Sequence, residues 1–481
     1  MDNDGIGSEL FMKDYQPGDI RNFAIVGHAS SGKTMLSEAM LACAGVINRM
    51  GTIAGGSTVS DYHDSEQHRQ ISVSATLMHL DWLGKKFNIL DCPGYADFIS
   101  EGLGALRVGD FALVVVHANH GVGVGTDAVW KYATEDDIPK MIVVNAFDKE
   151  ETNFEKTLAQ IRQHFGERVF PLTIPLNAGP GFNQVLDVPR NEVITYATDK
   201  SGKYTEAPTT GELAEKVKKL HEQLIEYIAE SDDKLMEKFF AQGGLSEEEM
   251  RAGLHAAIQK QVFTPLFITS AETNIGVARL MDFIAKYGSS PVDREKVKAT
   301  DPDGKEVEVS LTDSDPVLYV FKTMSEAQFG EMSFFRIYSG SVKFGSELFN
   351  TGRRSTEKIG QIYMLNGKTR TSVPSLGAGD IGAGVKLRTR TPATRCVAAR
   401  NRWRCPKSII PNPTSTPRSR AASKGRKTKS RPAWRRCTTR TRRSSTWSIP
   451  SCAKRSFPPR ASCTSRSSRR AFAAVTMSTS S

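Results

Sequence analysis

Five short apolar runs, separated by stretches with helical periodicity, dominate the first ~290 residues of the chain. The runs read NFAIVGH, KFNILDC, FALVVVHA, KMIVVNAFD and PLFITSA. They are rich in β-branched side chains and bounded by turn residues, which is typical of buried strands. Helical patterns such as TMLSEAMLACA lie between them. This alternation predicts an α/β fold: a doubly wound, parallel sheet with helices on both faces.

One gap of about 120 residues interrupts the alternation, between VVNAFD and FITSA. It begins with short strand patterns in RVFPLTIPLNAGPGFNQVLDV and continues into the helical stretch GELAEKVKKLHEQLIEYIAESDDKLMEKFF. Apolar residues recur there every three or four positions, which marks one helix face: Leu213, Val217, Leu220, Leu224 and Ile228. That face either packs on its own domain or binds a partner.

From about Ser310 the pattern changes to short strands separated by Gly and polar turns. PVLYVFKTM, SFFRIYSGSVKFG, KIGQIYML and DIGAGVKL are the clearest of these strands. They predict a small antiparallel β-barrel over residues 308–387. The stretch SSPVDREKVKATDPDGKE is the expected linker.

Charge divides the chain of 481 residues, whose formal charge is +11. The last 94 residues, from Arg388, contain 25 of the 64 Lys and Arg residues and none of the 53 Asp and Glu residues. The body is therefore acidic, and the basic character that suggests an anionic partner belongs to the tail. Cys43 and Cys92 of the body have no metal or disulfide spacing, as expected in a reducing cytosol. Without a long apolar run or a signal pattern, the sequence predicts a cytoplasmic protein outside membranes.

The segment GHASSGKT, Gly27–Thr34, fits the phosphate-binding pattern G-x-x-x-x-G-K-[ST] between a strand and a helix. Such a loop turns backbone N–H groups onto phosphate oxygens. We expect Lys33 to contact the β- and γ-phosphates and Thr34 to ligate Mg²⁺.

Three further segments follow strands. DCPG, Asp91–Gly94, offers a carboxylate for Mg²⁺ and a backbone N–H for the γ-phosphate. In NAFD, Asn145–Asp148, the carboxylate of Asp148 can accept from two guanine donors that adenine does not offer together. In TSAETN, Thr269–Asn274, the N–H of Ala271 can donate to guanine O6. Four segments in this order predict a guanine nucleotide pocket rather than a generic ATPase site.

At these segments the chain resembles elongation factor G, a ribosomal translational GTPase, over residues 15–387. Other family-like segments are DSEQHRQISV, GALRVGDFALVVV and SDDKLMEKFF. The resemblance implies a GTP-binding domain over residues 1–290, with an inserted subdomain at about 160–262, and then the barrel. It implies GTP, GDP and Mg²⁺ as ligands, the ribosome as partner, and a monomer. The residues expected at the nucleotide are Gly27, His28, Ala29, Ser30, Ser31, Gly32, Lys33, Thr34, Asp91, Gly94, Asn145, Asp148, Ser270 and Ala271, with Thr34, Ser72 and Asp91 on the metal.

Three departures from the family pattern bear on activity. Ala146 replaces the Lys of Asn-Lys-x-Asp, which predicts weaker nucleotide binding. Gln70 replaces a Gly of the first switch, while Ser72 keeps the metal-binding hydroxyl. Tyr95 replaces the His that orients the attacking water. A phenol keeps its proton at neutral pH and is no general base there, although it can still orient water. The expected catalytic residues are therefore Tyr95, Lys33 and Gly94, with slow or ribosome-dependent hydrolysis. The alternative is that one branch of the family normally uses tyrosine at this position.

The tail, residues 388–481, lacks any leucine as well as any acid. It is either a basic disordered arm, a nucleic-acid binder or the product of a frameshift. Codons read one base earlier permit family-like sequence in three places: KDTHTGDTL over Arg388–Cys396, LPKIDYP over Cys405–Pro411 and GELHL over Ala461–Ser465. We therefore expect a frameshifted, disordered tail that binds polyanions without specificity.

The sequence as a whole predicts an elongation factor of G type, truncated after its second domain, in which GTP hydrolysis is coupled to ribosomal translocation. Two alternatives stay open. One is a GTP-dependent ribosome-binding module with negligible hydrolysis, and the other is a translational GTPase of the release-factor or ribosomal-protection type.

Overall fold

The computed structural model describes most of the two predicted domains. The described residues are 14–242, 245–294, 296–300, 306–326, 330–350, 355–385 and 395–398. All statements below refer to these residues. The predicted tail lies outside them, except for one short strand.

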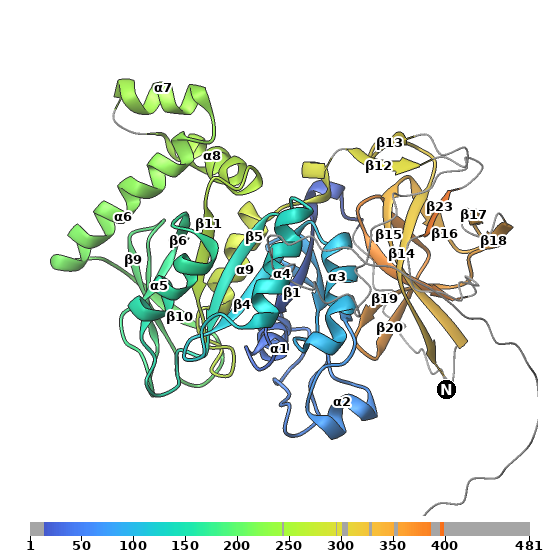
Figure 1. The fold of residues 1–481 in the computed structure, drawn as a ribbon, viewed down its shortest axis with the longest axis horizontal. Coiled ribbons are helices and arrows are strands. Elements are labelled where there is room, and N and C mark those ends of the chain that lie inside the picture. Colours follow the sequence, from blue (N-terminus) through green and yellow to red (C-terminus); the bar gives the residue numbers. More distant parts are fainter. Residues whose placement is uncertain are drawn as a thin grey trace, which may run out of the picture. The chain divides into compact units, whose positions relative to one another are not determined.

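Seven strands form the sheet of the first domain, in the order β2-β3-β1-β4-β5-β11-β6. Figure 1 labels β1, β4, β5, β11 and β6 of this sheet. Their bounds are β1 (Ile20–Gly27), β2 (Thr76–Trp82), β3 (Lys85–Asp91), β4 (Phe111–His117), β5 (Lys140–Asn145), β6 (Val169–Pro171) and β11 (Thr264–Ile268). The five predicted strands are confirmed as β1, β3, β4, β5 and β11, and they pair in parallel. The sheet is mixed, because β2 pairs antiparallel with β3 at one edge.

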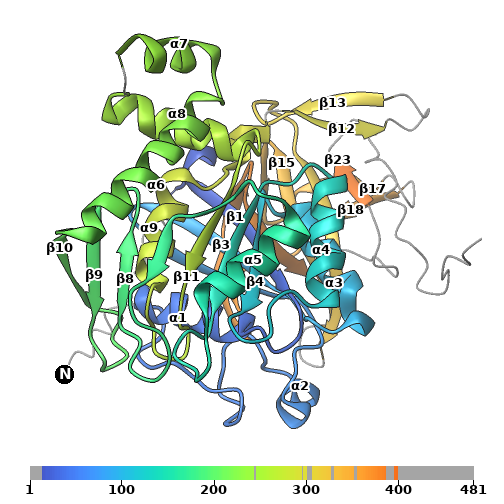
Figure 2. The ribbon, with the colours of Figure 1, turned by 60° about the vertical axis from the view of Figure 1, so that its left-hand side comes forward.

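Alternating residues of β1 explain why helices cover both faces of this sheet. Phe23 and Ile25 share a core with α1 and α9, whereas Ala24 and Val26 share a core with α3 and α4. Figure 2 shows α3, α4 and α5 side by side on one face. The bounds of the helices are α1 (Lys33–Cys43), α3 (Ile99–Val108), α4 (Val124–Glu135), α5 (Phe154–Phe165) and α9 (Val277–Tyr287).

The insertion begins later than the predicted boundary at about residue 160. Helix α5 packs on the main sheet and β6 pairs with β11, so both belong to the nucleotide domain. The insertion proper is a four-stranded sheet, β10-β9-β8-β7, followed by three helices. Its elements are β7 (Thr173–Pro175), β8 (Gln184–Asp187), β9 (Glu192–Tyr196), β10 (Tyr204–Pro208), α6 (Glu212–Ala229), α7 (Asp233–Gln242) and α8 (Glu247–Gln259). Val217, Leu224 and Ile228 of α6 are buried, so the predicted apolar face packs on its own domain.

An eight-stranded antiparallel sheet forms most of the second domain, in the order β18-β17-β23-β14-β15-β22-β19-β20. Its strands are β14 (Val317–Glu326), β15 (Gly330–Ser339), β17 (Glu347–Asn350), β18 (Ser355–Lys358), β19 (Ile362–Asn366), β20 (Thr369–Val373), β22 (Ile381–Val385) and β23 (Arg395–Ala398). A small sheet of β16 (Ser341–Lys343) and β21 (Ser375–Gly377) accompanies it.

Two details of the second domain differ from the prediction. The expected linker contains η3 (Pro291–Arg294) and β12 (Lys296–Thr300), and β12 pairs with β13 (Glu306–Ser310) in a separate hairpin. The barrel sheet therefore begins at β14 rather than at residue 308. Strand β23 lies in the segment predicted to be disordered, yet it pairs with β14 and β17. Strand pairing uses backbone groups, so it depends little on which side chains the segment carries.

Buried ion pairs join the two domains. Arg336 of β15 lies 2.6 Å from Asp110, and Lys86 of β3 lies 2.7 Å from Asp380; all four side chains are at most 10% exposed. Lys322 of β14 makes a third connection. Its ammonium donates to Ser74 Oγ and to Ala75 O at 2.6 Å, and it lies 2.9 Å from Glu101.

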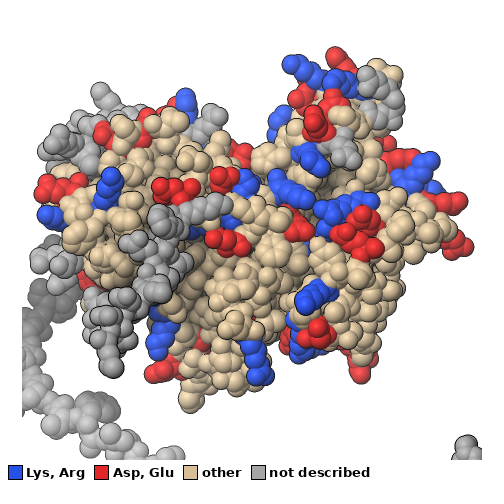
Figure 3. Space-filling view, turned by 180° about the vertical axis from the view of Figure 1, so that it is seen from behind, with Lys and Arg blue, Asp and Glu red and all other residues tan. Residues whose placement is uncertain are grey.

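The surface carries both signs of charge. On the face drawn in Figure 3, basic and acidic side chains are interspersed and neither sign forms a continuous patch. In the described part of the chain, no helix is both long enough and apolar enough to cross a membrane.

Candidate functional site

The predicted phosphate loop connects β1 to α1 in a tight turn. Gly32 has φ 87°, and a Cβ atom there would lie 2.2 Å from Asn145 Nδ2, so a larger residue does not fit. Lys33, the first residue of α1, is buried, and its ammonium donates to His28 O at 2.6 Å. Burial lowers the pKa of Lys33 to about 8, against the nearby charge of Asp91. The helix N-terminus and Lys33 together make this loop a site for anions.

The three predicted metal ligands come together beside this loop. Asp91 ends β3 and is fully buried; its Oδ2 accepts from Ser60 Oγ at 2.7 Å, while its Oδ1 has no hydrogen-bond partner among the described residues. Thr34 Oγ1 and Ser72 Oγ lie 3.1 Å apart. Burial raises the pKa of Asp91. An unpaired carboxylate oxygen at such depth is costly unless a cation or proton balances it.

Asp61 adds a second carboxylate that the sequence analysis missed. It is 4% exposed, and its Oδ1 also lacks a hydrogen-bond partner in the described part of the chain. Burial, and next the charge of Asp91, raise the pKa of Asp61 to about 7. Asp61, Thr34 and Ser72 line one cavity of about 90 Å³. Two buried carboxylates with two hydroxyls are the oxygen ligands that Mg²⁺ prefers, so the residues present fit this ion. Asp61 lies in a stretch without periodicity, so no sequence signal marked it.

The DCPG segment lies directly against the phosphate loop. A Cβ atom on Gly94 would lie 2.4 Å from Lys33 Nζ and 2.6 Å from Ala29 N, so only glycine permits this approach. Tyr95 is 43% exposed and lines the same cavity as Lys33 and Gly94. The three predicted catalytic residues therefore lie together.

Asn145, at the end of β5, ties the phosphate loop to the predicted base loop. Its Nδ2 donates to Ser31 O at 3.1 Å, and its Oδ1 accepts from Ala271 N at 2.9 Å. The Ala271 N–H that the sequence assigned to guanine O6 thus has a partner within the protein. Asn145 positions both loops.

Asp148, the predicted base-selecting residue, is held in place by Ser270. The Ser270 hydroxyl donates to Asp148 Oδ1 at 2.6 Å, and Lys149 lies 3.3 Å from the same carboxylate. Ala146, in place of the family's Lys, has φ 71°. His28 and Ser30 are exposed on the phosphate loop, and His28 Nδ1 accepts from Gly125 N at 3.3 Å.

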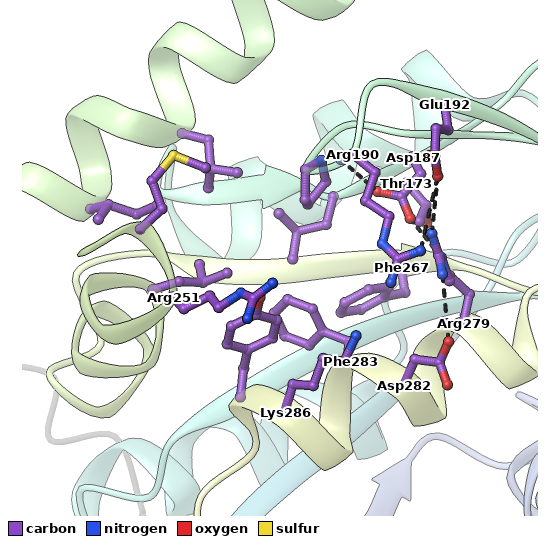
Figure 4. A pocket seen from close by; sticks show the side chains of 17 residues that line it. Thr173, Asp187, Arg190, Glu192, Arg251, Phe267, Arg279, Asp282, Phe283 and Lys286 are labelled. Carbon is purple, nitrogen blue, oxygen red and sulfur yellow. Dashed lines mark hydrogen bonds and ion pairs between the residues drawn. The ribbon is translucent and has the colours of Figure 1, made fainter. Parts of the chain in front are cut away.

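A larger cavity, of about 430 Å³, lies elsewhere, between the insertion and α9 (Figure 4). Arg279 of α9 dominates one end of it. Its guanidinium lies 2.8 Å from Asp187, 3.5 Å from Glu192 and 3.5 Å from Asp282. The residues predicted to bind nucleotide do not line this cavity. The larger cavity is therefore not the predicted nucleotide site. The ion pairs of Arg279 connect the insertion to α9 of the nucleotide domain.

Comparisons with known proteins agree with this geometry. The elongation factor Tu GTP binding domain matches residues 18–290, and elongation factor G domain 2 matches residues 316–394. A crystal structure of a protein from Thermus thermophilus is similar, with a TM-score of 0.70 and 29% identity over 79% of this chain. The similarity covers 54% of that protein, so this chain spans about half of its length. The chain belongs to the translational GTPase family defined by the elongation factor Tu GTP binding domain, and its second domain makes it elongation factor G-like.

Proposed function

We propose that this protein binds GTP and GDP with Mg²⁺ and hydrolyses GTP slowly, on the ribosome, as a factor of G type. One observation carries the proposal: the phosphate loop, DCPG and the Asp148 loop follow β1, β3 and β5 at the carboxyl edge of a single sheet. Ligands of open α/β sheets bind at that edge. The translation-factor family supports the cytoplasm as location. We further propose that the protein acts as a monomer.

In this mechanism Lys33 and the loop amides hold the β- and γ-phosphates, and the Gly94 N–H faces the γ-phosphate. Thr34, Ser72, Asp91 and Asp61 would hold Mg²⁺, which supplies neutralising charge on the phosphates. Asp148 selects guanine. Tyr95 lines the cavity in front of Lys33 and would orient the attacking water through its hydroxyl. Binding at Ser72 and Gly94 would order both switch segments, and release would relax them.

Calorimetry with GDP, GTP and ATP tests the binding step. We expect binding of both guanine nucleotides and no measurable binding of ATP. The Asp148→Asn variant should lose about 100-fold in GDP affinity, since two charge-assisted hydrogen bonds are lost, and should gain xanthosine diphosphate binding. Equal affinity for ATP and GTP would refute the proposal.

One alternative, a ribosome-binding module with negligible hydrolysis, is favoured by Tyr95. Single-turnover GTP hydrolysis with and without ribosomes separates the two functions. Tyr95→His should raise turnover on ribosomes well above the parent. No change in that variant would rule out Tyr95 as the cause of slow hydrolysis. A release-factor or ribosomal-protection role shares the same two domains, and a peptide-release or tetracycline-rescue assay would reveal it.

A further inference from the structure

Gln70 is a second polar side chain at the cavity in front of Lys33. It follows α2 (Asp64–Arg69) and lines the 90 Å³ cavity together with Tyr95, Gly94 and Ser72. The side chain is exposed, and none of the hydrogen bonds seen among the described residues involves its carboxamide. The carboxamide is therefore available to a molecule in the cavity.

The backbone of Gln70 adopts a conformation that suits glycine. Its φ is 56°, in the left-handed region where a Cβ atom is unfavourable. Glycine at this position would remove that strain, yet the chain has a long amide side chain. Strain of this kind that the surrounding structure enforces is a reason to look for function.

The surrounding structure does enforce it. The carboxylate of Glu66, 1% exposed, accepts from Val73 N at 3.0 Å and from Ser74 N at 3.1 Å. The backbone carbonyl of Glu66 accepts from Gln70 N and from Ile71 N at 3.3 Å. Two residues beyond Gln70, the Ser72 hydroxyl meets Thr34. Gln70 thus stands on a loop fixed on both sides, as positioning of a small molecule requires.

We propose that the Gln70 carboxamide orients the attacking water in GTP hydrolysis together with the Tyr95 hydroxyl, which lines the same cavity; this inference rests on the proposed function. The carboxamide offers an acceptor for a water hydrogen and donors for a phosphate oxygen, whereas a phenol has one hydroxyl for both tasks. The water oxygen bonds to the γ-phosphorus, and the bond to the bridging oxygen breaks with its electron pair going to GDP. A water proton passes to a phosphate oxygen. Gln70 gains and loses no proton, as for the water-orienting glutamine of other GTPases.

The test measures single-turnover GTP hydrolysis on ribosomes, GTP affinity and melting temperature for the full chain and three variants. Gln70→Gly and Gln70→Ala remove the carboxamide, and the first also removes the strain. Lys200→Gly is the matched control, because Lys200 has φ 63° on an exposed turn of the insertion. We expect Gln70→Gly and Gln70→Ala to hydrolyse GTP about 10- to 100-fold more slowly with affinity within about threefold of the parent. Gln70→Gly and Lys200→Gly should both melt at a higher temperature than the parent, because each removes a strained residue. Of these two variants, only Lys200→Gly should keep the parental turnover.

The outcomes separate the inference from the function on which it rests. Parental turnover in both Gln70 variants overturns the inference and leaves the GTPase proposal standing. A slow variant that has also lost GTP affinity shows a structural role and overturns it too. A parent chain that binds GTP without hydrolysing it overturns both the Gln70 inference and the proposed hydrolysis. A parent chain that binds no guanine nucleotide refutes the proposed function itself.

Discussion

Ala146 is a single residue at which the site departs from its family. It follows Asn145 with φ 71°, a conformation in which an L-residue is strained. A lysine here would place its stem and ammonium along the guanine ring. We expect Ala146→Lys to bind GDP about fivefold to tenfold more tightly, because a cation near an aromatic face is worth about 1 kcal/mol. Displacement of a fluorescent GDP analogue measures this.

The control for that substitution is Ala146→Gly, which removes the strain but adds no cation. It should stabilise the protein slightly and leave GDP affinity unchanged. An equal gain in affinity from both variants would show that backbone strain, and not the missing lysine, limits binding.

The sequence identified candidate site residues that belong to contiguous motifs. It did not identify residues that come close to the site only when the chain folds. Lys33, Asp91 and Gly94 were identified because their motif spacing and their place at strand ends indicate phosphate chemistry. Asp61 was not, since its burial beside Asp91 depends on how a loop without periodicity folds back. Asn145 was expected at the nucleotide, and its contacts with Ser31 and Ala271 on two separate loops could not be predicted because they too depend on the fold.

Among the elements, the short helix α2 depends on one buried carboxylate. Glu66 accepts from Val73 N and Ser74 N, so Glu66→Gln places an amide donor near backbone donors. We expect a loss of about 1–3 kcal/mol in local stability. Hydrogen exchange at Val73 and Ser74 should accelerate accordingly. Asp64→Asn, an exposed change in the same helix, should leave those rates as they are; protection that persists in Glu66→Gln would contradict this role.

Helix α8 meets η3 through an ion pair that titrates. His255 Nε2 lies 2.9 Å from Asp293 Oδ1, and this hydrogen bond raises the pKa of His255. A raised histidine pKa contributes stability below about pH 6.5, and that stability is lost as the pH rises through the raised value. Between pH 6 and 8 the parent should therefore lose about 1 °C more in melting temperature than His255→Gln, a small effect because the pair is partly exposed.

His221→Gln is the control for that pH dependence, since His221 faces the backbone carbonyl of Val188. It should follow the parent's curve. Identical curves for the parent and for His255→Gln would remove His255 as the titrating group.

For the whole molecule, the contact between Arg336 and Asp110 is the most deeply buried charge pair of the domain interface among the described residues. Arg336→Met leaves the buried Asp110 carboxylate with the Asn22 amide but without its cationic partner, which costs about 3–5 kcal/mol. Urea unfolding should show a lower midpoint. Adding Asp110→Leu should restore part of the loss, because it removes the unpaired charge but also takes an acceptor from the buried Asn22 amide. If Arg336→Met alone were as stable as the parent, this role of the ion pair would be contradicted.

The architecture as a whole was largely predictable from the sequence. The differences between the prediction and the structure have physical causes. Continuous β-branched runs indicated β1, β3, β4, β5 and β11, since strands buried on both faces are apolar throughout. The strand β6 lies after the expected start of the insertion yet pairs with β11 of the main sheet, and such long-range pairing leaves no trace in the local sequence pattern. β23 was missed because its pairing uses backbone groups alone.

The ammonium of Lys322 has three hydrogens and meets three acceptors: Ser74 Oγ, Ala75 O and Glu101. Two of these follow the loop that Glu66 holds, and the third stands on α3. All three N–H groups of the ammonium therefore have an acceptor within the protein. A displacement of either segment must therefore pull β14 along or break one of these contacts, so the Lys322 side chain couples the segment after α2 and helix α3 to the barrel.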